Sequence, residues 1–150
     1  MPRMTRQTAN IILYRQGKEL EVFLVSRSRE MRFLGGYLAF AGGKTESGDE
    51  TLPLDEAVEA GQRTLLGCAV RELFEETGIL ALRNSPLSKK DTATLRQELL
   101  QGGTAAGFFS TLAELGASLP PDTLQQALQL VTPGFSRERY ASTFFLMETG

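Results

Sequence analysis

The sequence predicts an α/β fold in a single domain of residues 1–150. Three observations predict this class: two β-rich runs near the start, a helical pattern with an apolar stripe near the middle, and an aromatic, β-branched run at the end. A chain of 150 residues is long enough to bury one core and too short for two comfortable domains. The 41% hydrophobic and 23% charged residues are typical of an ordinary soluble globular protein, so we expect a packed core.

The first strands are predicted from three short runs. Residues 8–15 (TANIILYR) and 20–27 (LEVFLVSR) are rich in apolar and β-branched residues, and the polar QGKE between them indicates a hairpin. Residues 37–43 (YLAFAGG) predict another short strand that runs into a glycine turn. Residues 44–61 are acidic and contain Gly and Pro, so we expect mainly a loop, with one helical turn in DEAVEA at 55–60.

A helix is predicted from about Gln62 to Thr77. Its apolar residues recur at i, i+3, i+4 and i+7 and form one buried stripe, made of Leu66, Ala69, Val70 and Leu73. Gly78 follows the last periodic residue and is a natural helix stop. Residues 79–82 (ILAL) then predict a short buried strand.

The character of the sequence changes at about residues 85–131, where we predict a helical insertion. Residues 85–101 begin with Ser and Asp capping candidates, and residues 106–116 and 120–131 predict two further helices. Residues 139–150 have the composition of a strand. A strand at that position, with nothing after it to cover the sheet, predicts that the chain is the N-terminal part of a longer protein.

Composition excludes several kinds of chemistry. There is no histidine, which removes Ser-His-Asp and Cys-His catalysis and histidine metal ligands, and the only cysteine, Cys68, excludes a disulfide within the chain. The net charge of −2 and the lack of clustered Lys and Arg do not favour nucleic acid as a partner. No long apolar run or signal-peptide core occurs, so we predict a cytoplasmic protein with no membrane partner.

The stretch VRELFEETGIL at residues 70–80 crowds three glutamates together. Glu72, Glu75 and Glu76 stand at i, i+3 and i+4 on nearly one helix face, where like charges destabilise a helix. One explanation is a solvated face with Arg71 paired to Glu75. The other is a divalent cation, because hard oxygen ligands without His or Cys suit Mg²⁺ or Mn²⁺. The Gly-rich acidic turn at 41–49 could add backbone carbonyl ligands.

The residues GGKTESGD…RELFEETGI resemble the Nudix box, a Gly-rich loop followed by a helix with the pattern R-E-apolar-x-E-E-x-G-apolar. The resemblance implies an α/β/α sandwich with a mixed sheet. It implies that Glu72, Glu75 and Glu76 hold Mg²⁺ ions on a diphosphate, and that one of them assists the attacking water. It also implies that Arg71 orients the glutamates by ion pairing and that Gly42 offers its carbonyl to a metal.

The resemblance has three departures. Asp49 stands where the box usually has Glu, and Ala41 replaces the usual Pro. The spacing between Gly43 and Arg71 is longer than in the ordinary box, which places an insertion at about residues 50–63. Added length in a loop costs little closure entropy, so the ligands need not be disturbed. The roles of Asp49 and Glu50 stay open.

Residues 23–43 are also similar to the signature of the Nudix coenzyme A diphosphatases, and the interrupted box and residues 132–146 resemble the peroxisomal branch. The matching residues of the signature are Arg27, Ser28, Arg32, Gly36, Phe40, Gly42 and Gly43. This resemblance implies that Arg27, Arg32, Gly36 and Phe40 bind substrate, with the arginines on phosphates. A solvated strand end and loop is the alternative for the arginines.

Side chains of the predicted insertion and of the box helix have two explanations each. We predict that Cys68 is a small buried residue, although it could border the metal site. We predict that Lys89 and Lys90 are solvated. The apolar residues of the second predicted insertion helix are expected in the insertion core, or as a roof over a pantetheine-like arm; they are Phe108, Phe109, Leu112 and Leu115.

The resemblance therefore predicts Mg²⁺- or Mn²⁺-dependent hydrolysis of a nucleoside diphosphate linked to another moiety, with coenzyme A or an acyl derivative as the first substrate choice. ADP-ribose or a similar compound is the competing substrate. A degenerate domain that binds a nucleotide and serves as a regulatory module is the competing function. The expected partner is a small nucleotide, and a homodimer is the assembly considered.

Overall fold

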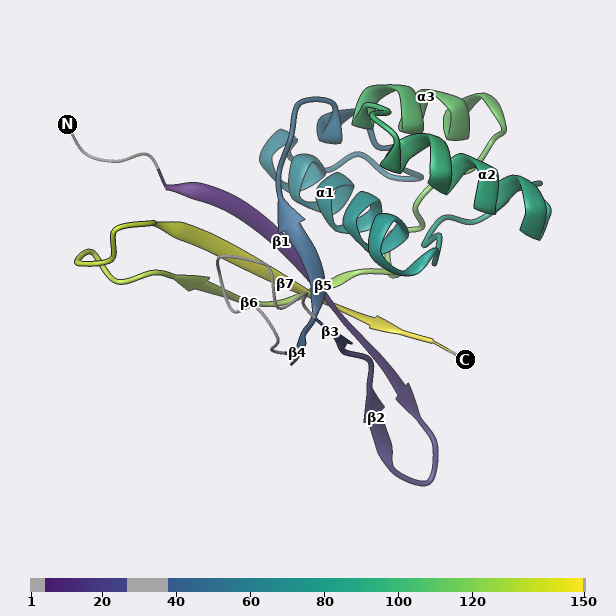
Figure 1. Ribbon diagram of the computed structural model, residues 1–150. Coiled ribbons are helices and arrows are strands. Elements are labelled where there is room, and N and C mark those ends of the chain that lie inside the picture. Colours follow the sequence, from purple (N-terminus) through teal and green to yellow (C-terminus); the bar gives the residue numbers. More distant parts are fainter. Residues whose placement is uncertain (1–4, 27–37, 150) are drawn as a thin grey trace.

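The computed structural model describes residues 5–26 and 38–149, and the positions below refer to these residues. Their helices and strands follow one another in the order shown in Figure 1. The elements are β1 (Arg6–Gln16), β2 (Leu20–Val22), β3 (Val25–Ser26), β4 (Leu38–Ala39), β5 (Ala41–Lys44), the 3₁₀ turn η1 (Asp49–Thr51), α1 (Ala60–Thr77), α2 (Lys89–Leu100), α3 (Ala105–Glu114), β6 (Gln125–Val131) and β7 (Tyr140–Glu148).

Five of the described strands form a mixed sheet around β1, and β3 and β4 form a separate antiparallel pair. The strand order is β2-β1-β7-β6, and β5 also pairs with β1. The β1–β7 pairing is parallel, from Arg6 opposite Tyr140 to Tyr14 opposite Glu148, whereas β2, β5 and β6 pair antiparallel with their neighbours. The predicted hairpin is confirmed by β1 and β2, and the predicted glycine-rich strand is split into β4 and β5.

The three helices lie on the same side of the sheet (Figure 1). Helix α1 packs on β1 and β5, α2 contacts α1 and α3, and α3 contacts η1. The predicted stripe of α1 is buried, and it meets alternate side chains of β1 and Phe145 of β7. The Phe74 and Phe108 rings stack with centroids 5.2 Å apart, which joins α1 to α3. The mixed sheet with three helices confirms the predicted fold class.

The helix ends follow from local chemistry. Helix α1 begins at Ala60, slightly before the predicted start, and ends at Thr77. The next residue, Gly78, caps it with a φ of 78°, a left-handed value that favours glycine. In α2 the Ser88 hydroxyl accepts a hydrogen bond from the Asp91 backbone N–H at 3.1 Å, as its capping pattern predicts. Thr104 caps α3 in the same way. The two helices predicted at 85–101 and 106–116 are therefore confirmed.

The helix predicted at residues 120–131 is wrong, because residues 125–131 form strand β6. Gln, Ala and Leu favour a helix locally, but the antiparallel ladder with β7 supplies backbone hydrogen bonds that depend on a distant segment. The α-helices of the predicted insertion therefore end at Glu114, and the remainder of that segment returns to the sheet.

Two smaller predictions also fail. Residues 79–82 are buried or half-buried but form no strand, because they pack beside the helices; only Arg83, just beyond them, pairs, forming an isolated bridge with Ser118. The helical turn expected at 55–60 occurs earlier, as η1, where Asp49 is buried. Leu54 is instead tied to Leu119 by an isolated bridge, which holds the loop extended.

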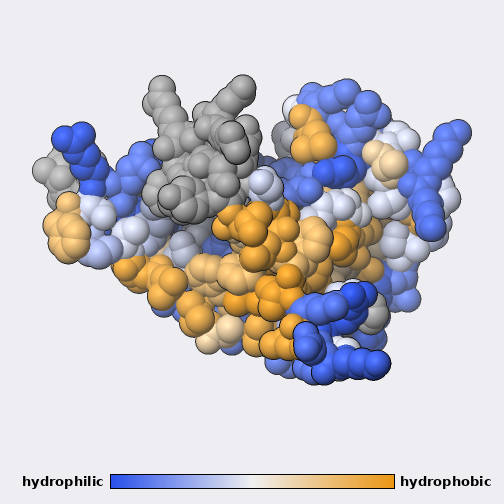
Figure 2. Space-filling model, turned by 60° about the horizontal axis from the view of Figure 1, so that its bottom comes forward, coloured by the Kyte–Doolittle hydropathy of each residue, from blue (hydrophilic) through white to orange (hydrophobic). Residues whose placement is uncertain are grey.

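The sheet face turned away from the helices carries apolar side chains, which appear as the orange area in Figure 2. Side chains alternate between the two faces of a strand, and paired residues share a face. Because Ile11 and Phe145 point to the core, Ile12, Phe144 and Leu146 point to this other face. We call it the open face; its exposed members are Leu20, Val22, Leu128 and Leu130.

No helix in residues 5–26 and 38–149 combines the length and the apolar character that crossing a membrane requires.

Candidate active site

The box is assembled where β5 runs beside α1, and two consecutive glycines of β5 make the close approach possible. A Cβ on Gly43 would collide with the Glu72 carboxylate, and a Cβ on Gly42 would collide with Asn10 and the Ala9 carbonyl. A side chain at either position would therefore push the strand away from α1 or from β1. The glycines let the Glu72 carboxylate lie directly against the main chain of β5.

Arg71 and Asp49 form a buried ion pair behind the glutamates. The Arg71 side chain is 2% exposed and that of Asp49 is fully buried. Arg71 Nε donates to Asp49 Oδ1 at 2.8 Å and Nη2 donates to Asp49 Oδ2 at 3.1 Å, a bidentate arrangement. Nη2 also donates to the Lys44 carbonyl at 3.0 Å. Asp49, whose role was open from the sequence, is therefore the buried partner of Arg71.

The same guanidinium reaches the glutamates of α1. Arg71 Nη1 lies 3.0 Å from Glu72 Oε1 and 3.4 Å from Glu75 Oε1, and Nε lies 3.3 Å from Glu46 Oε1. The Gly42 N–H donates to Glu76 Oε2 at 3.3 Å. Asp49 thus fixes Arg71, and Arg71 in turn holds Glu72 and Glu75, while Glu76 reaches β5 directly.

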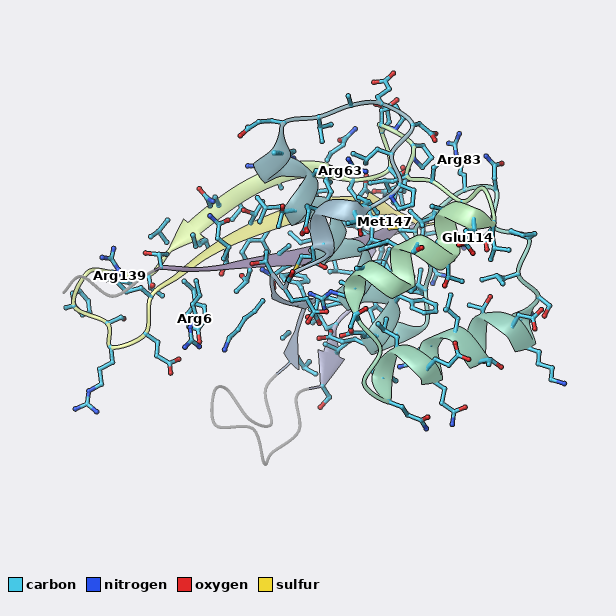
Figure 3. The ribbon with its side chains drawn as sticks, turned by 90° about the horizontal axis from the view of Figure 1, so that it is seen from above. Arg6, Arg63, Arg83, Glu114, Arg139 and Met147 are labelled. Atoms are coloured by element: carbon cyan, nitrogen blue, oxygen red, sulfur yellow. The ribbon has the colours of Figure 1, made fainter. Side chains whose placement is uncertain are left out.

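The box loop is held against α1 at two points, one just before the insertion and one inside it. Gly67 allows the Asp49 carbonyl to touch the helix, because a Cβ there would collide with that oxygen. Arg63, which is labelled in Figure 3, donates from Nε and Nη2 to the Leu52 carbonyl at 3.0 and 2.7 Å. The inserted residues therefore begin at a point that is fixed on α1, and they do not displace Asp49.

Burial opposes the ionisation of the glutamates at the site. Desolvation raises the pKa of Glu72 to about 7, with Glu75 and Glu76 adding to the rise and Arg71 opposing it. Desolvation also raises the pKa of Glu75. Burial alone would lower the pKa of Arg71, but its hydrogen bond and ion pair with Asp49 raise it above its ordinary value. The crowded carboxylates therefore favour a proton or a cation.

Cys68 borders this arrangement. Its Sγ donates to the Gly43 carbonyl at 3.4 Å and accepts from Arg71 Nη2 at 3.7 Å. Burial, with the negative charge of Asp49 adding to it, raises the pKa of the thiol to about 12. The side chain is buried, as predicted, and its high pKa makes it an inert thiol.

The donor set fits a hard divalent cation. Three carboxylates and the main chain of β5 offer oxygen ligands, and a cation would offset the burial, and the smaller repulsion by Glu75 and Glu76, that raise the pKa of Glu72. Within the described ranges, however, no three acidic or thiol side chains converge as a ready metal site. Arg71 Nη1 lies between Glu72 and Glu75 and contacts Oε1 of each, so a shared ion would compete with Arg71 for these two oxygens.

The predicted substrate-binding residues are only partly placed. Arg27, Arg32 and Gly36 lie outside the described residues. Phe40 is half-buried and packs edge-on against Phe144, with ring centroids 6.2 Å apart. Since Ala41 and Phe145 point to the core, Phe40 lies on the side of the sheet away from α1.

The side chains predicted in the insertion are also placed. Lys89 and Lys90 are exposed, as predicted, and Phe108, Phe109 and Leu112 are core residues rather than a roof. Leu115 is partly exposed.

Two residues near the box were not singled out from the sequence. Asn10, a polar residue in an apolar run, lies against Gly42 and donates to Thr8 Oγ1 at 3.3 Å. Its interruption of the strand pattern was the signal available. Arg96 of α2 donates to main-chain carbonyls at the end of α1. No local pattern distinguishes it from a solvated helix arginine.

A helix that carries three glutamates and packs against two glycines of a mixed sheet defines a Nudix-type box. Comparison with known sequences agrees. The NUDIX domain profile matches residues 4–121, so the chain belongs to the NUDIX domain family. It is 25% identical over 145 residues to "Putative nudix hydrolase 7" of Caenorhabditis elegans, covering 95% of this chain. The chain spans 44% of the length of that nematode protein.

Solved structures show the same fold. The crystal structure of a NUDIX hydrolase from Alicyclobacillus acidocaldarius superposes with a TM-score of 0.78 at 29% identity, covering 97% of this chain and 70% of that one. A MutT/nudix family protein from Enterococcus faecalis superposes with a TM-score of 0.53 at 16% identity, covering 99% of this chain and 38% of that one. The second likeness concerns the fold alone.

Proposed function

We propose that the chain carries the catalytic box of a Mg²⁺- or Mn²⁺-dependent hydrolase that cleaves a nucleoside diphosphate linked to another moiety. The observation that carries this proposal is the set of Glu72, Glu75 and Glu76 on the last turns of α1, facing the glycines of β5 and backed by the buried Arg71–Asp49 pair. The family membership and the hydrolase names of the relatives support the same reaction class.

The residues have separate roles in this proposal. Glu72, Glu75 and Glu76 would hold the cation, together with the carbonyl of Gly42, and one of these glutamates would accept a proton from the attacking water. A cation held there would polarise phosphoryl oxygens and neutralise developing charge. Arg71 orients Glu72 and Glu75, and Asp49 fixes Arg71. The chemistry needs no histidine, which the sequence lacks.

Coenzyme A or an acyl-coenzyme A is the proposed substrate, and the cytoplasm is the proposed location of the protein. The spacing of Arg27, Arg32, Gly36 and Phe40 supports it, because that spacing is similar to the signature of coenzyme A diphosphatases. Arginines at those positions suit a ligand with a diphosphate and a separate 3′-phosphate.

The test is hydrolysis of coenzyme A by the full-length protein with Mg²⁺, followed by separation of 3′,5′-ADP and phosphopantetheine. We expect Glu76→Gln to lower kcat by about 100-fold or more, because the substitution removes a negative ligand or a proton acceptor. Glu114→Gln is the matched control, because Glu114, labelled in Figure 3, is exposed at the end of α3.

Three other results are informative. Faster turnover of ADP-ribose than of coenzyme A would change the substrate and keep the reaction class. Nucleotide binding without turnover would favour a regulatory domain. Turnover by Glu76→Gln at the wild-type rate would exclude the proposed site.

A further inference from the structure

The last turn of α1 carries Glu75 and Glu76, and its carbonyls are held from outside by Arg96 of α2. Arg96 Nε lies 3.1 Å from the Phe74 oxygen and 2.9 Å from the Glu75 oxygen, and Nη2 donates to the Glu75 oxygen at 2.7 Å. The last carbonyls of a helix have no intrahelical partner, and a cation there is favourable. The Phe74 oxygen also accepts a hydrogen bond from the Gly78 N–H at 2.9 Å, so Arg96 adds a second, charged cap to this helix end.

The neighbouring helix α3 supports the other part of the box. A Cβ on Gly48 would collide with the backbone nitrogen of Ala106, in the first turn of α3. Gly48 also has φ 102°, a left-handed value that favours glycine. It directly precedes Asp49, the partner of Arg71. The two helices thus touch the glycine loop and the glutamate turn, although neither helix provides a glutamate of the box.

We propose that Arg96 is a positioning residue that fixes the last turn of α1, so that Glu75 and Glu76 are presented together to a cation. The effect on catalysis rests on the proposed function; the effect on the helix end does not. Arg96 contacts main-chain oxygens rather than substrate, so its action passes through the helix. Helix α2 then serves the site through this guanidinium, while α3 contacts the glycine loop at Gly48.

The sign of the effect on cation binding separates positioning from simple charge. No carboxylate in the described part of the chain forms an ion pair with Arg96. Removing a positive charge from the end of the glutamate helix would, by Coulomb's law alone, tighten the binding of a divalent cation. Loss of positioning would weaken it. Weaker cation binding after removal of Arg96 would therefore indicate that Arg96 acts by ordering the last turn of α1 and not through its charge.

A variant at this position is expected to fold. Arg96 is half-buried and lines an open groove of about 570 Å³ between α2 and Gly78, together with Leu87, Ala93 and Gln97. Water in the groove can bond to the carbonyls that Arg96 leaves, so they are not stranded in the core. Arg96→Met keeps the length and apolar stem of the side chain and removes its donors.

The experiment is titration of the full-length protein with Mn²⁺, followed by electron paramagnetic resonance of the free ion. We expect Arg96→Met to bind Mn²⁺ about 10-fold more weakly, the size typical of lost outer-shell support. Arg96→Lys keeps the charge and one donor group and should fall between the two. Lys90→Met removes a positive charge from the same helix at an exposed position and should bind like wild type. Unchanged or tighter binding by Arg96→Met would overturn the proposal.

Hydrogen exchange of the amides at residues 76–79 gives a readout that needs neither metal nor substrate. We expect Arg96→Met to exchange about 10-fold faster there, with unchanged exchange in the rest of α1, because hydrogen bonds from a charged donor are lost. If wild type binds no Mn²⁺, the proposed function fails, and exchange alone decides the positioning role. Equal exchange in wild type and variant would exclude that role.

Discussion

Glu72 lies where burial and two neighbouring carboxylates oppose its negative charge, even though Arg71 donates to it. Its folded-state pKa of about 7 is above the ordinary 4.5. The folded state therefore binds this proton more tightly than the unfolded state. The contribution to stability is complete below pH 4.5 and is lost as the pH rises through 7.

We therefore predict that Glu72→Gln stabilises the metal-free protein at pH 8 and has little effect at pH 5. Gln resembles the protonated carboxyl, so the variant avoids the cost of the buried charge. The expected gain in the free energy of unfolding at pH 8 is about 1–3 kcal/mol. Urea denaturation at both pH values measures it, with the exposed Glu114→Gln as control.

The same residue gives a cation-dependent result. Mg²⁺ should stabilise wild type more at pH 8 than at pH 5, because a cation and a proton compete for the same carboxylates. The Glu72→Gln variant should lose most of that stabilisation. A variant as stable as wild type in metal-free buffer at pH 8 would show that the Glu72 charge carries no cost.

At the scale of elements, helix α1 and the box loop lie so close together that the Asp49 carbonyl occupies the space that a side chain at Gly67 would need. In an open helix interior, Gly→Ala stabilises by roughly 1 kcal/mol, because alanine has the higher helix propensity. At Gly67 the added Cβ would collide with the Asp49 carbonyl, and backbone cannot move as a side-chain end does. The steric cost therefore exceeds the propensity gain.

We predict opposite effects for two glycines of this one helix. Gly67→Ala should lower the free energy of unfolding by about 1–3 kcal/mol, the usual cost of overpacking, and should weaken Mn²⁺ binding through Asp49 and Arg71. Gly61→Ala should raise stability, because its Cβ would meet only a Glu59 side-chain oxygen at 3.5 Å. Thermal unfolding of both variants measures this. Equal stabilisation by both substitutions would mean that the loop yields at no cost.

The elements that the sequence predicts well are those whose pattern is local. The stripe of α1, its stop at Gly78 and the Ser88 cap are each specified within a few residues, and each appears in the structure. Strand β6 was mistaken for a helix because Gln, Ala and Leu favour one and only the pairing with β7 reveals a strand.

The same distinction applies to the candidate site. The glutamates and Arg71 could be selected from one continuous motif, whereas the contacts of Asp49 and Arg96 depend on residues far away in the sequence. The insertion of about 50–63 hides the spacing that would link Asp49 to Arg71. A contact between an arginine and the carbonyls of another helix does not change the hydrophobic periodicity of the sequence. Arg96 could therefore be found only from the packing of α2 on α1.

At the scale of the whole molecule, the described helices cover only one side of the sheet (Figure 1). The other side, the open face, is apolar (Figure 2). Strand β6 adds an edge that is exposed along its length and carries no charged side chain. Exposed apolar patches and uncharged edge strands favour association with other chains. Leu128 and Leu130 belong to both features, with 45% and 59% of their surfaces exposed.

We predict that the chain of residues 1–150 self-associates through this face and that Leu128→Lys with Leu130→Lys suppresses association. Lysine on an edge strand opposes pairing, and both side chains are exposed, so folding should persist. Sedimentation velocity should give a smaller weight-average mass for the double variant, with less binding of an apolar dye. Leu100→Lys, on α2 and 56% exposed, is the control and should associate like wild type. Equal association in all three proteins would place the contact elsewhere, and a homodimer would then not use the open face.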